Sequence, residues 1–445
     1  TGVPGVVRML GEAHAAHGES AWADLFTAAI ALSEDGFVVS DRLSTMLASS
    51  ARMLRSVPDT ATYFYTEDGA ALAVGSLLKN PAFAATLRRI ATDGADAFYE
   101  GPVAEAIVAR IDRAIADSPH PDYAGMTLED IATYRAKTRE PVCGSYRVYQ
   151  VCGMGPPSSG GVAVLQILGM LEPFDMGALG PESAEAVHLI AEASRRAYAD
   201  RALYLADADF VPVPVGALTE PGYLLKRSAG IDPAKVIAAE AEPGRPDGIE
   251  AFPYAPTPSR RGRSTTHLSV VDADGNAASL TSSIATGFGP RPMAGRFLLN
   301  NQLTDFSAVP AIDGVPVANA PAAGKRPLSS MSPTIVFDAD GSLRLVIGSP
   351  GGPAIIGFVA KTIVAHLDWG LGIQAAIDYP HILNQNGSTV IEDMAPVNGM
   401  AGALEAMGHT VRMRPMASGL HGIAVTPEGI FGSADGRREG IALGD

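Results

Sequence analysis

The chain has 445 residues, of which 47% are hydrophobic and 18% are charged. This composition indicates a globular protein with a large core, and the length suggests two or three domains or one large α/β unit. A formal net charge of −15 argues against nucleic acid or an anionic membrane as the main partner. No apolar run approaches the roughly 20 residues of a membrane-spanning helix.

The first third of the chain is predicted to be helical. Apolar residues recur at three- and four-residue spacing in successive segments, and the Thr127–Asp130 capping box begins another helix, expected to reach about Ala136. The periodic segments are Val6–His17, Trp22–Leu32, Leu43–Leu54, Phe83–Ala91 and Val103–Ala116.

The two cysteines lie in the stretch Pro141–Met154, which is predicted to be rich in β-structure, with Val142–Val151 alternating as a strand pair. A possible turn at Gly144-Ser145 would not place Cys143 opposite Cys152. We therefore expect two buried free thiols, and two cysteines alone cannot form a zinc site.

Two helices and a linker follow. Val162–Leu171 and the longer Ser183–Leu205 show helical periodicity, and the charged face of the second is expected to be solvated or to meet another helix. Ala238–Ser264 is rich in Pro, Gly, Arg and Ala, which predicts an exposed segment where a chain break is tolerated.

The last 180 or so residues are predicted to form both strands and helices. Thr266–Asp272 and Ala277–Ile284 flank an Asp-Gly turn and predict a β-hairpin, as do Thr334–Asp338 and Leu343–Ile347. The remaining predictions are helices at Ile355–Leu367 and Met400–Met407 and short strands at Thr389–Ile391, Val411–Arg414 and Gly422–Thr426.

Several motifs occur in an order that resembles one known family. They are Gly2–Gly5, Pro156–Gly161, Arg196–Arg201, Thr265–Asn276, Asn300–Phe306, Lys325–Pro333 and Gly348–Gly352. Over nearly its whole length the chain resembles the γ-glutamyltranspeptidase family of N-terminal-nucleophile hydrolases. The resemblance implies an α+β fold, a four-layer αββα sandwich, formed by two intertwined subunits, residues 1–264 and residues 265–445, that remain together as a heterodimer after cleavage before Thr265.

A terminal threonine is a plausible nucleophile for a physical reason. An ordinary threonine hydroxyl needs a base within hydrogen-bond reach. Cleavage before Thr265 would free an α-amino group with an ordinary pKa of roughly 7.7–8.0, which can accept the hydroxyl proton near neutral pH. One residue then supplies both groups, so no metal or cofactor is expected.

The resemblance also assigns the other site residues. Ser283 would orient the nucleophile, and the backbone N–H groups of Gly351 and Gly352 would stabilise the oxyanion. For a small-molecule substrate with an amino-acid head group, Asp305 would bind the α-ammonium, with Gln302 beside it. The pair Ser329 and Ser330 would hold the α-carboxylate. His188, His267 and His421 show no metal-ligand spacing and are interpreted as structural.

The chain departs from the family pattern in two places. Ala285 stands where relatives usually have an asparagine that helps to hold the α-amino group, and the stretch between Phe306 and Lys325 is shorter than in well-known members. The arginine that grips the α-carboxylate belongs to a part of the family pattern upstream of Thr1, so we expect the chain to be N-terminally incomplete relative to its family. The compartment stays open: periplasmic or secreted by resemblance, cytoplasmic for a biosynthetic homologue.

Three hypotheses follow for function. The first is cleavage of γ-glutamyl amides, with glutathione the expected substrate. The second keeps the nucleophile but changes the bond, as in acylases of β-lactam side chains or homologues that cleave a C–C bond in antibiotic pathways. The third is an unprocessed, inactive binding protein.

Overall fold

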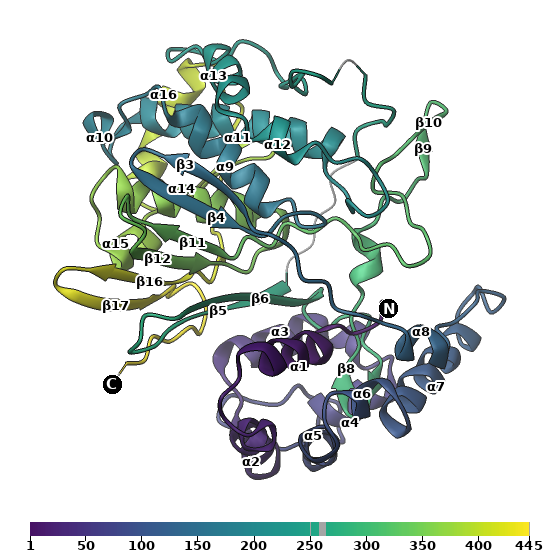
Figure 1. Ribbon diagram of the computed structural model, residues 1–445. Coiled ribbons are helices and arrows are strands. Elements are labelled where there is room, and N and C mark those ends of the chain that lie inside the picture. Colours follow the sequence, from purple (N-terminus) through teal and green to yellow (C-terminus); the bar gives the residue numbers. More distant parts are fainter. Residues whose placement is uncertain (250, 258–263, 445) are drawn as a thin grey trace. The chain divides into compact units, whose positions relative to one another are not determined.

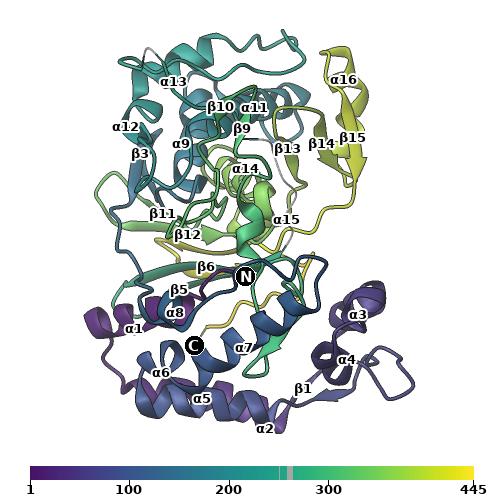
Figure 2. The ribbon, with the colours of Figure 1, turned by 90° about the vertical axis from the view of Figure 1, so that its right-hand side faces the viewer.

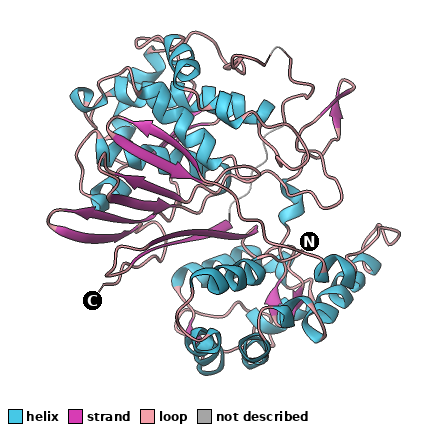
Figure 3. Cartoon of the chain, viewed as in Figure 1, coloured by secondary structure: helices cyan, strands magenta, loops and turns pink. Residues whose placement is uncertain are grey.

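The computed structural model describes residues 1–249, 251–257 and 264–444 (Figure 1). The chain forms two compact units, Thr1–Thr138 with Ile284–Gln302, and Arg139–Ser283 with Leu303–Asp445. The first is mainly helical and the second combines helices with sheets, as Figure 3 shows by colour. This mixed content confirms the predicted α+β class. The bond before Thr265 lies inside the second unit, so residues 1–264 contribute to both units.

The first unit follows the helical prediction closely. Its helices are α1 (Val6–His17), η1 (Trp22–Phe26), α2 (Thr27–Asp35), α3 (Asp41–Leu54), α4 (Pro58–Phe64), α5 (Pro81–Asp93), α6 (Asp96–Tyr99), α7 (Pro102–Ala116) and α8 (Leu128–Ala132). Short strand pairs join β1 (Phe37–Val38) to β2 (Leu77–Leu78) and β7 (Met293–Ala294) to β8 (Phe297–Leu298). The capping box at Thr127 and Asp130 forms, but α8 stops before Ala136, where Thr133 and Tyr134 are weak helix formers.

The second unit is built on a six-stranded antiparallel sheet with the order β17-β16-β12-β11-β4-β3. Its strands are β3 (Val142–Tyr146), β4 (Tyr149–Gly153), β11 (Thr334–Phe337), β12 (Leu343–Gly348), β16 (His421–Thr426) and β17 (Gly429–Ala434). A smaller sheet contains β13 (Ile382–Asn384), β14 (Thr389–Glu392) and β15 (Val411–Arg414). The short strands β9 (Ala311–Ile312) and β10 (Val315–Pro316) form a further pair.

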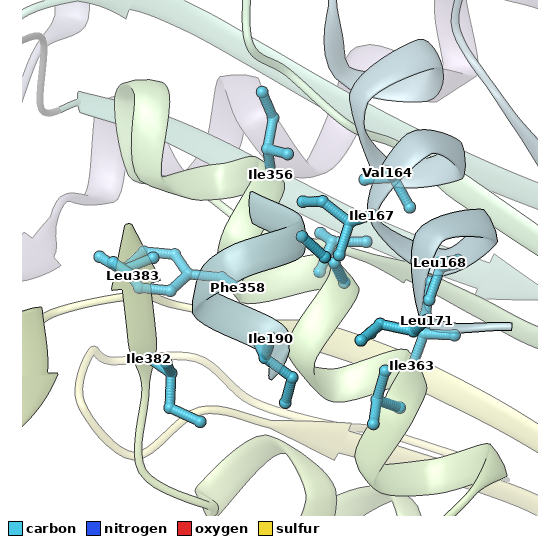
Figure 4. Close-up of a cluster of buried hydrophobic side chains, with 14 of the residues drawn as sticks. Val164, Ile167, Leu168, Leu171, Ile190, Ile356, Phe358, Ile363, Ile382 and Leu383 are labelled. Atoms are coloured by element: carbon cyan, nitrogen blue, oxygen red, sulfur yellow. The ribbon is translucent and has the colours of Figure 1, made fainter. Parts of the chain in front are cut away.

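Helices α9 (Gly160–Leu171), α11 (Ala184–Tyr204) and α14 (Ile355–Leu367) form the main core of this unit (Figure 4). Apolar side chains of all three helices and of β13 interdigitate there, which removes a large apolar area from water. Shorter elements complete the unit: α10 (Met176–Leu179), α12 (Val215–Leu218), α13 (Pro221–Ala229), η2 (Gln302–Asp305), η3 (Gly352–Ala354), α15 (Ile373–Asp378), η4 (Val397–Met400) and α16 (Ala401–Ala406).

The charged face of α11 is not solvated, which decides between the two interpretations offered above. Glu192 and Arg195 are only 1% and 3% exposed. Arg195 and Arg196 both donate hydrogen bonds to the Glu192 carboxylate, at 2.8 and 2.5 Å. The buried charges are therefore paired, as burial requires.

The predicted nucleophile hairpin is confirmed as β5 (Ser264–Val271) and β6 (Ala277–Ala285). Its turn is closed by Asp272, whose carboxylate accepts hydrogen bonds from the backbone N–H groups of Asp274 and Asn276. Figures 1 and 2 both show the hairpin beside β12 and β16. Ser279 Oγ donates to Ile347 O of β12 at 3.3 Å, which is one contact between the hairpin and that strand.

The prediction of two buried free thiols is wrong. Cys143 and Cys152 form a disulfide, directly opposite each other in the β3–β4 register with 4.1 Å between their Cα atoms. The turn lies at Arg147-Val148 rather than at Gly144-Ser145, and this shift of register brings the cysteines together. Cys143 is exposed and Cys152 is only partly buried.

Candidate active site

The open end of the β5–β6 hairpin places Thr265 beside Ser283. The two hydroxyl oxygens are 3.5 Å apart, and Ser283 Oγ donates a 2.5 Å hydrogen bond to the carbonyl oxygen of Ser264. Both threonine and serine side chains are partly buried. The predicted nucleophile, its predicted orienting hydroxyl and the bond that would be cut therefore lie within hydrogen-bond distance of one another.

His267, two residues after Thr265, is a buried strand residue. Its ring nitrogens lie 2.8 Å from Thr281 Oγ1 and 3.1 Å from Ser269 Oγ. Burial, reinforced by nearby His421, lowers the pKa of His267 to about 3. The ring is therefore neutral at neutral pH, and its position among hydroxyls agrees with the structural interpretation.

Gly351 and Gly352 lie between the end of β12 and the start of α14, the strand-to-helix context that the sequence predicts. Both have positive φ values, 144° and 59°. A Cβ added to Gly351 would come within 2.7 Å of the Phe358 ring. Glycine is needed at position 351, and both glycines precede α14, where the first backbone N–H groups have no partner within the helix.

Arg438 links this loop to the nucleophile strand, and nothing in the sequence pattern predicted its role. Its Nη1 donates to the Thr265 carbonyl at 3.4 Å. A Cβ on Gly419 would meet both Arg438 Cδ and Pro350 Cγ, at 2.7 and 2.8 Å. Arg438 therefore contacts Thr265, and its side chain lies near Pro350 of the loop that carries the two glycines.

Ser329 and Ser330 pack against the Pro156–Gly161 loop. Ser159 N and Oγ both donate to the Ser329 carbonyl, at 2.9 and 2.6 Å, and Ser329 N donates to Pro157 O at 3.0 Å. Arg201 of α11 donates to Ser330 Oγ and to Ser159 Oγ. Pro156–Gly161, Ser329–Ser332 and Arg201 thus form one hydrogen-bonded network, which we call the serine corner. Arg201 had no predicted role.

Asp305 ends the one-turn helix η2, which begins at Gln302. Its backbone carbonyl accepts a 2.8 Å hydrogen bond from Asn319 Nδ2. Burial lowers the pKa of the Arg201 guanidinium, whereas the negative potentials of Tyr198 and Asp305 raise it. Asp305 therefore lies near enough to Arg201 to act on the pKa of its guanidinium.

Ala285 has a left-handed backbone, with φ of 73°. This conformation is costly for alanine, whereas asparagine tolerates it better than most residues. The departure from the family pattern at this position is therefore unfavourable for the backbone as well as for the predicted contact.

The part of the chain that the structure describes contains no group of three or more His, Cys, Asp or Glu side chains arranged to hold a metal ion. Within the same residues, no helix is both long and apolar enough to cross a bilayer.

The family model described as Gamma-glutamyltranspeptidase matches residues 1–445. The chain belongs to the γ-glutamyltranspeptidase family. It is accordingly an enzyme of this type, as its curated relatives are. The glutathione hydrolase proenzyme of Escherichia coli strain K12 is 38% identical over 98% of this chain and 74% of that protein. The acylase ACY 1 proenzyme of Pseudomonas sp. strain V22 is 35% identical over 99% of this chain and 74% of that protein.

Solved structures of the family agree with the fold. The cephalosporin acylase from Bacillus halodurans has a TM-score of 0.83 and 25% identity over 98% of this chain and 76% of its own. The γ-glutamyltranspeptidase of Helicobacter pylori has a TM-score of 0.52 and 35% identity over 56% of this chain and 70% of its own. The enzyme thus resembles both glutathione hydrolases and acylases.

Proposed function

We propose that this γ-glutamyltranspeptidase-family enzyme is cut before Thr265 and cleaves γ-glutamyl amides of the glutathione type. The γ-glutamyl group passes to the Thr265 hydroxyl and then to water, or to an amino-acid or peptide acceptor. The observation that carries the proposal is the pairing of Thr265 and Ser283 at the Ser264–Thr265 bond, with 3.5 Å between their hydroxyl oxygens.

Processing follows from the contacts of the intact chain. Thr265 Oγ attacks the Ser264 carbonyl carbon, and the peptide becomes an ester as the amide nitrogen gains a proton. Water then hydrolyses the ester and leaves a free amine on Thr265. Ser283 Oγ already donates to the Ser264 carbonyl oxygen at 2.5 Å, where negative charge develops during the attack.

Cleavage changes what the two hydroxyls do. The Ser283 hydroxyl orients Thr265 Oγ in place of its contact with the Ser264 carbonyl, while the new α-amine accepts the threonine proton. The fragments 1–264 and 265–445 stay together as a heterodimer, because both contribute strands to the main sheet of the second unit. In this state we expect the four-layer αββα sandwich of the N-terminal-nucleophile hydrolases.

Each of the remaining site residues binds a different part of the substrate. Backbone N–H groups of Gly351 and Gly352 stabilise the oxyanion of each tetrahedral intermediate. Asp305, with Gln302 beside it, binds the α-ammonium, and Ser329 and Ser330 bind the α-carboxylate. This charge arrangement matches a zwitterionic amino-acid head group.

A second function keeps the nucleophile and changes the acyl group. Ala285 removes the side-chain amide that relatives use to hold the α-amino group, and several relatives are named acylases. Loss of one buried hydrogen-bond partner costs a few kcal/mol of recognition. The alternative substrates are therefore acyl amides, or an amino-acid-derived intermediate cleaved at a C–C bond.

One experiment separates the hypotheses. Purified wild-type protein and Thr265→Ala are run on a denaturing gel and assayed for glutamate release from glutathione. The proposal expects two fragments and activity for the wild type, and an uncut, inactive chain for Thr265→Ala. A cut wild type that leaves glutathione intact would favour the acylase-type alternative, and an uncut wild type would favour a binding protein.

A further inference from the structure

Arg201, in the last turn of α11, donates hydrogen bonds from two different nitrogens to two serine hydroxyls. Its Nε lies 2.8 Å from Ser159 Oγ, and its Nη2 lies 2.7 Å from Ser330 Oγ. Ser159 is fully buried and Ser330 is 8% exposed. The planar guanidinium therefore fixes both hydroxyl oxygens from one rigid group.

Ser159 and its neighbour Ser158 also donate hydrogen bonds to the segment that carries Ser330. Ser159 Oγ donates its own proton to Ser329 O at 2.6 Å, and Ser158 Oγ donates to Met331 O at 2.5 Å. A parallel bridge between Ser158 and Ser329 aligns the two segments. The corner is therefore a closed network in which Arg201 is the positively charged member.

This network sets the direction of the Ser330 hydrogen bond. Arginine can only donate, so the Ser330 oxygen is an acceptor toward Arg201 and its own proton is available to another acceptor. Arg201 also places a permanent positive charge directly behind that hydroxyl. Both effects favour an anionic acceptor next to Ser330.

The neighbouring arginines of the same helix behave differently. Arg195 donates hydrogen bonds to the Glu192 carboxylate and to the carbonyl of Ala238. Those are the contacts of an arginine that stabilises the fold. Arg201 instead contacts two hydroxyls, one of them from the pair that the family resemblance assigns to the substrate carboxylate.

We propose that Arg201 is a positioning residue that holds Ser330 as a hydrogen-bond donor to the substrate α-carboxylate and supplies the positive potential behind it. This inference rests on the proposed function. Loss of Arg201 should therefore lower kcat/KM for substrates that carry an α-carboxylate. It should have little effect on kcat/KM for the same amide without that carboxylate.

The test compares the wild-type enzyme with Arg201 variants on two anilide substrates. One is γ-glutamyl-p-nitroanilide, and the other is 4-aminobutyryl-p-nitroanilide, which has the same amide and ammonium but no α-carboxylate. In Arg201→Met we expect kcat/KM for the first to fall roughly tenfold to hundredfold, mainly through KM, as for loss of a charged hydrogen-bond partner. For the second substrate kcat/KM stays within about twofold, since no carboxylate is present to lose that contact. Arg201→Lys keeps the charge and should give an intermediate KM.

Arg195→Met is the matched control on the same helix. It should lower the melting temperature but leave the ratio of the two kcat/KM values unchanged. If Arg201→Met is not processed, Arg201→Gln, which removes the charge but keeps a donor, carries the same comparison. Equal losses on both anilides for the Arg201 variants, or the same selectivity change in Arg195→Met, would overturn the inference. Failure of the wild type to cleave either anilide would overturn the proposed function itself.

Discussion

The nucleophile hairpin and the serine corner are two parts of the proposed site, and their hydrogen bonds differ. At the hairpin, the contacts of Ser269 and Ser279 with the main sheet measure 3.4 and 3.3 Å, and Thr265 Oγ1 lies 3.5 Å from Ser283 Oγ, whereas the contact from Ser283 Oγ to Ser264 O is short, at 2.5 Å. In the serine corner, formed by Pro156–Gly161, Ser329–Ser332 and Arg201, side-chain contacts of 2.5 to 2.8 Å predominate. Short, mutually supporting hydrogen bonds make a more rigid structure than isolated long ones.

The difference suits the two tasks. Under the proposed function, the serine corner binds substrate and should keep the same geometry before and after cleavage. The hairpin should change when the Ser264–Thr265 bond is cut, since Ser283 would then exchange the Ser264 carbonyl for the Thr265 hydroxyl. We therefore expect substitutions at the hairpin to affect processing and turnover, and substitutions in the corner to affect substrate affinity.

The largest effect is expected for Gly351→Ala. The added methyl group would meet Phe358 at 2.7 Å and would occupy a backbone with φ of 144°. Displacement of an oxyanion donor should lower kcat by roughly 10²–10³-fold. Gly370→Ala is the control, because it has φ of 66° but no atom within 4 Å of the new Cβ. Similar kcat values for both variants would show that the loop is not part of the oxyanion site.

Ser283→Ala should slow processing by roughly tenfold to hundredfold, because the Ser264 carbonyl loses its donor as charge develops on it. The rate is read from a time course on a denaturing gel. Ser279→Ala, on the same strand but bonded to β12, should be processed at the wild-type rate. Normal processing of Ser283→Ala would contradict the assignment.

Ala285→Asn restores the side-chain amide that relatives use to hold the substrate α-amino group. Asparagine relieves a left-handed alanine, which costs about 1 kcal/mol, so the melting temperature of this large chain should rise by about one degree. If the γ-glutamyl assignment is right, KM for γ-glutamyl-p-nitroanilide should also fall. A rise in stability with weaker γ-glutamyl cleavage would favour the acylase-type alternative.

The smallest effect concerns acid stability. The folded-state pKa of His267 is lowered to about 3 from 6.5, so the unfolded chain binds this proton first and stability falls as pH drops through that window. His267→Gln should therefore lose less melting temperature than the wild type over the same range. Identical pH profiles would mean that His267 is not buried as described.

The sequence predicted what depends on local pattern. Both hairpins and the long helices appear within a few residues of their expected ends, because apolar periodicity and Asp-Gly turns act locally. The Cys143–Cys152 disulfide was missed because it depends on a turn placed three residues further along.

Side chains that act across the fold were not predictable in this way. Arg201 lay in a motif that the resemblance singled out, but only the packing of α11 against the Pro156–Gly161 loop shows what it contacts. Arg438 lies outside all of the motifs described above. Both depend on segments that are far apart in the chain, and neither periodicity nor spacing carries that information.

The most direct test of the central claim is the N-terminal sequence and intact mass of the matured protein, measured beside its activity. The account predicts two chains, with the second beginning at Thr265, and activity that appears in step with cleavage. A fully active uncut chain, or a second chain that begins at any other residue, would contradict it.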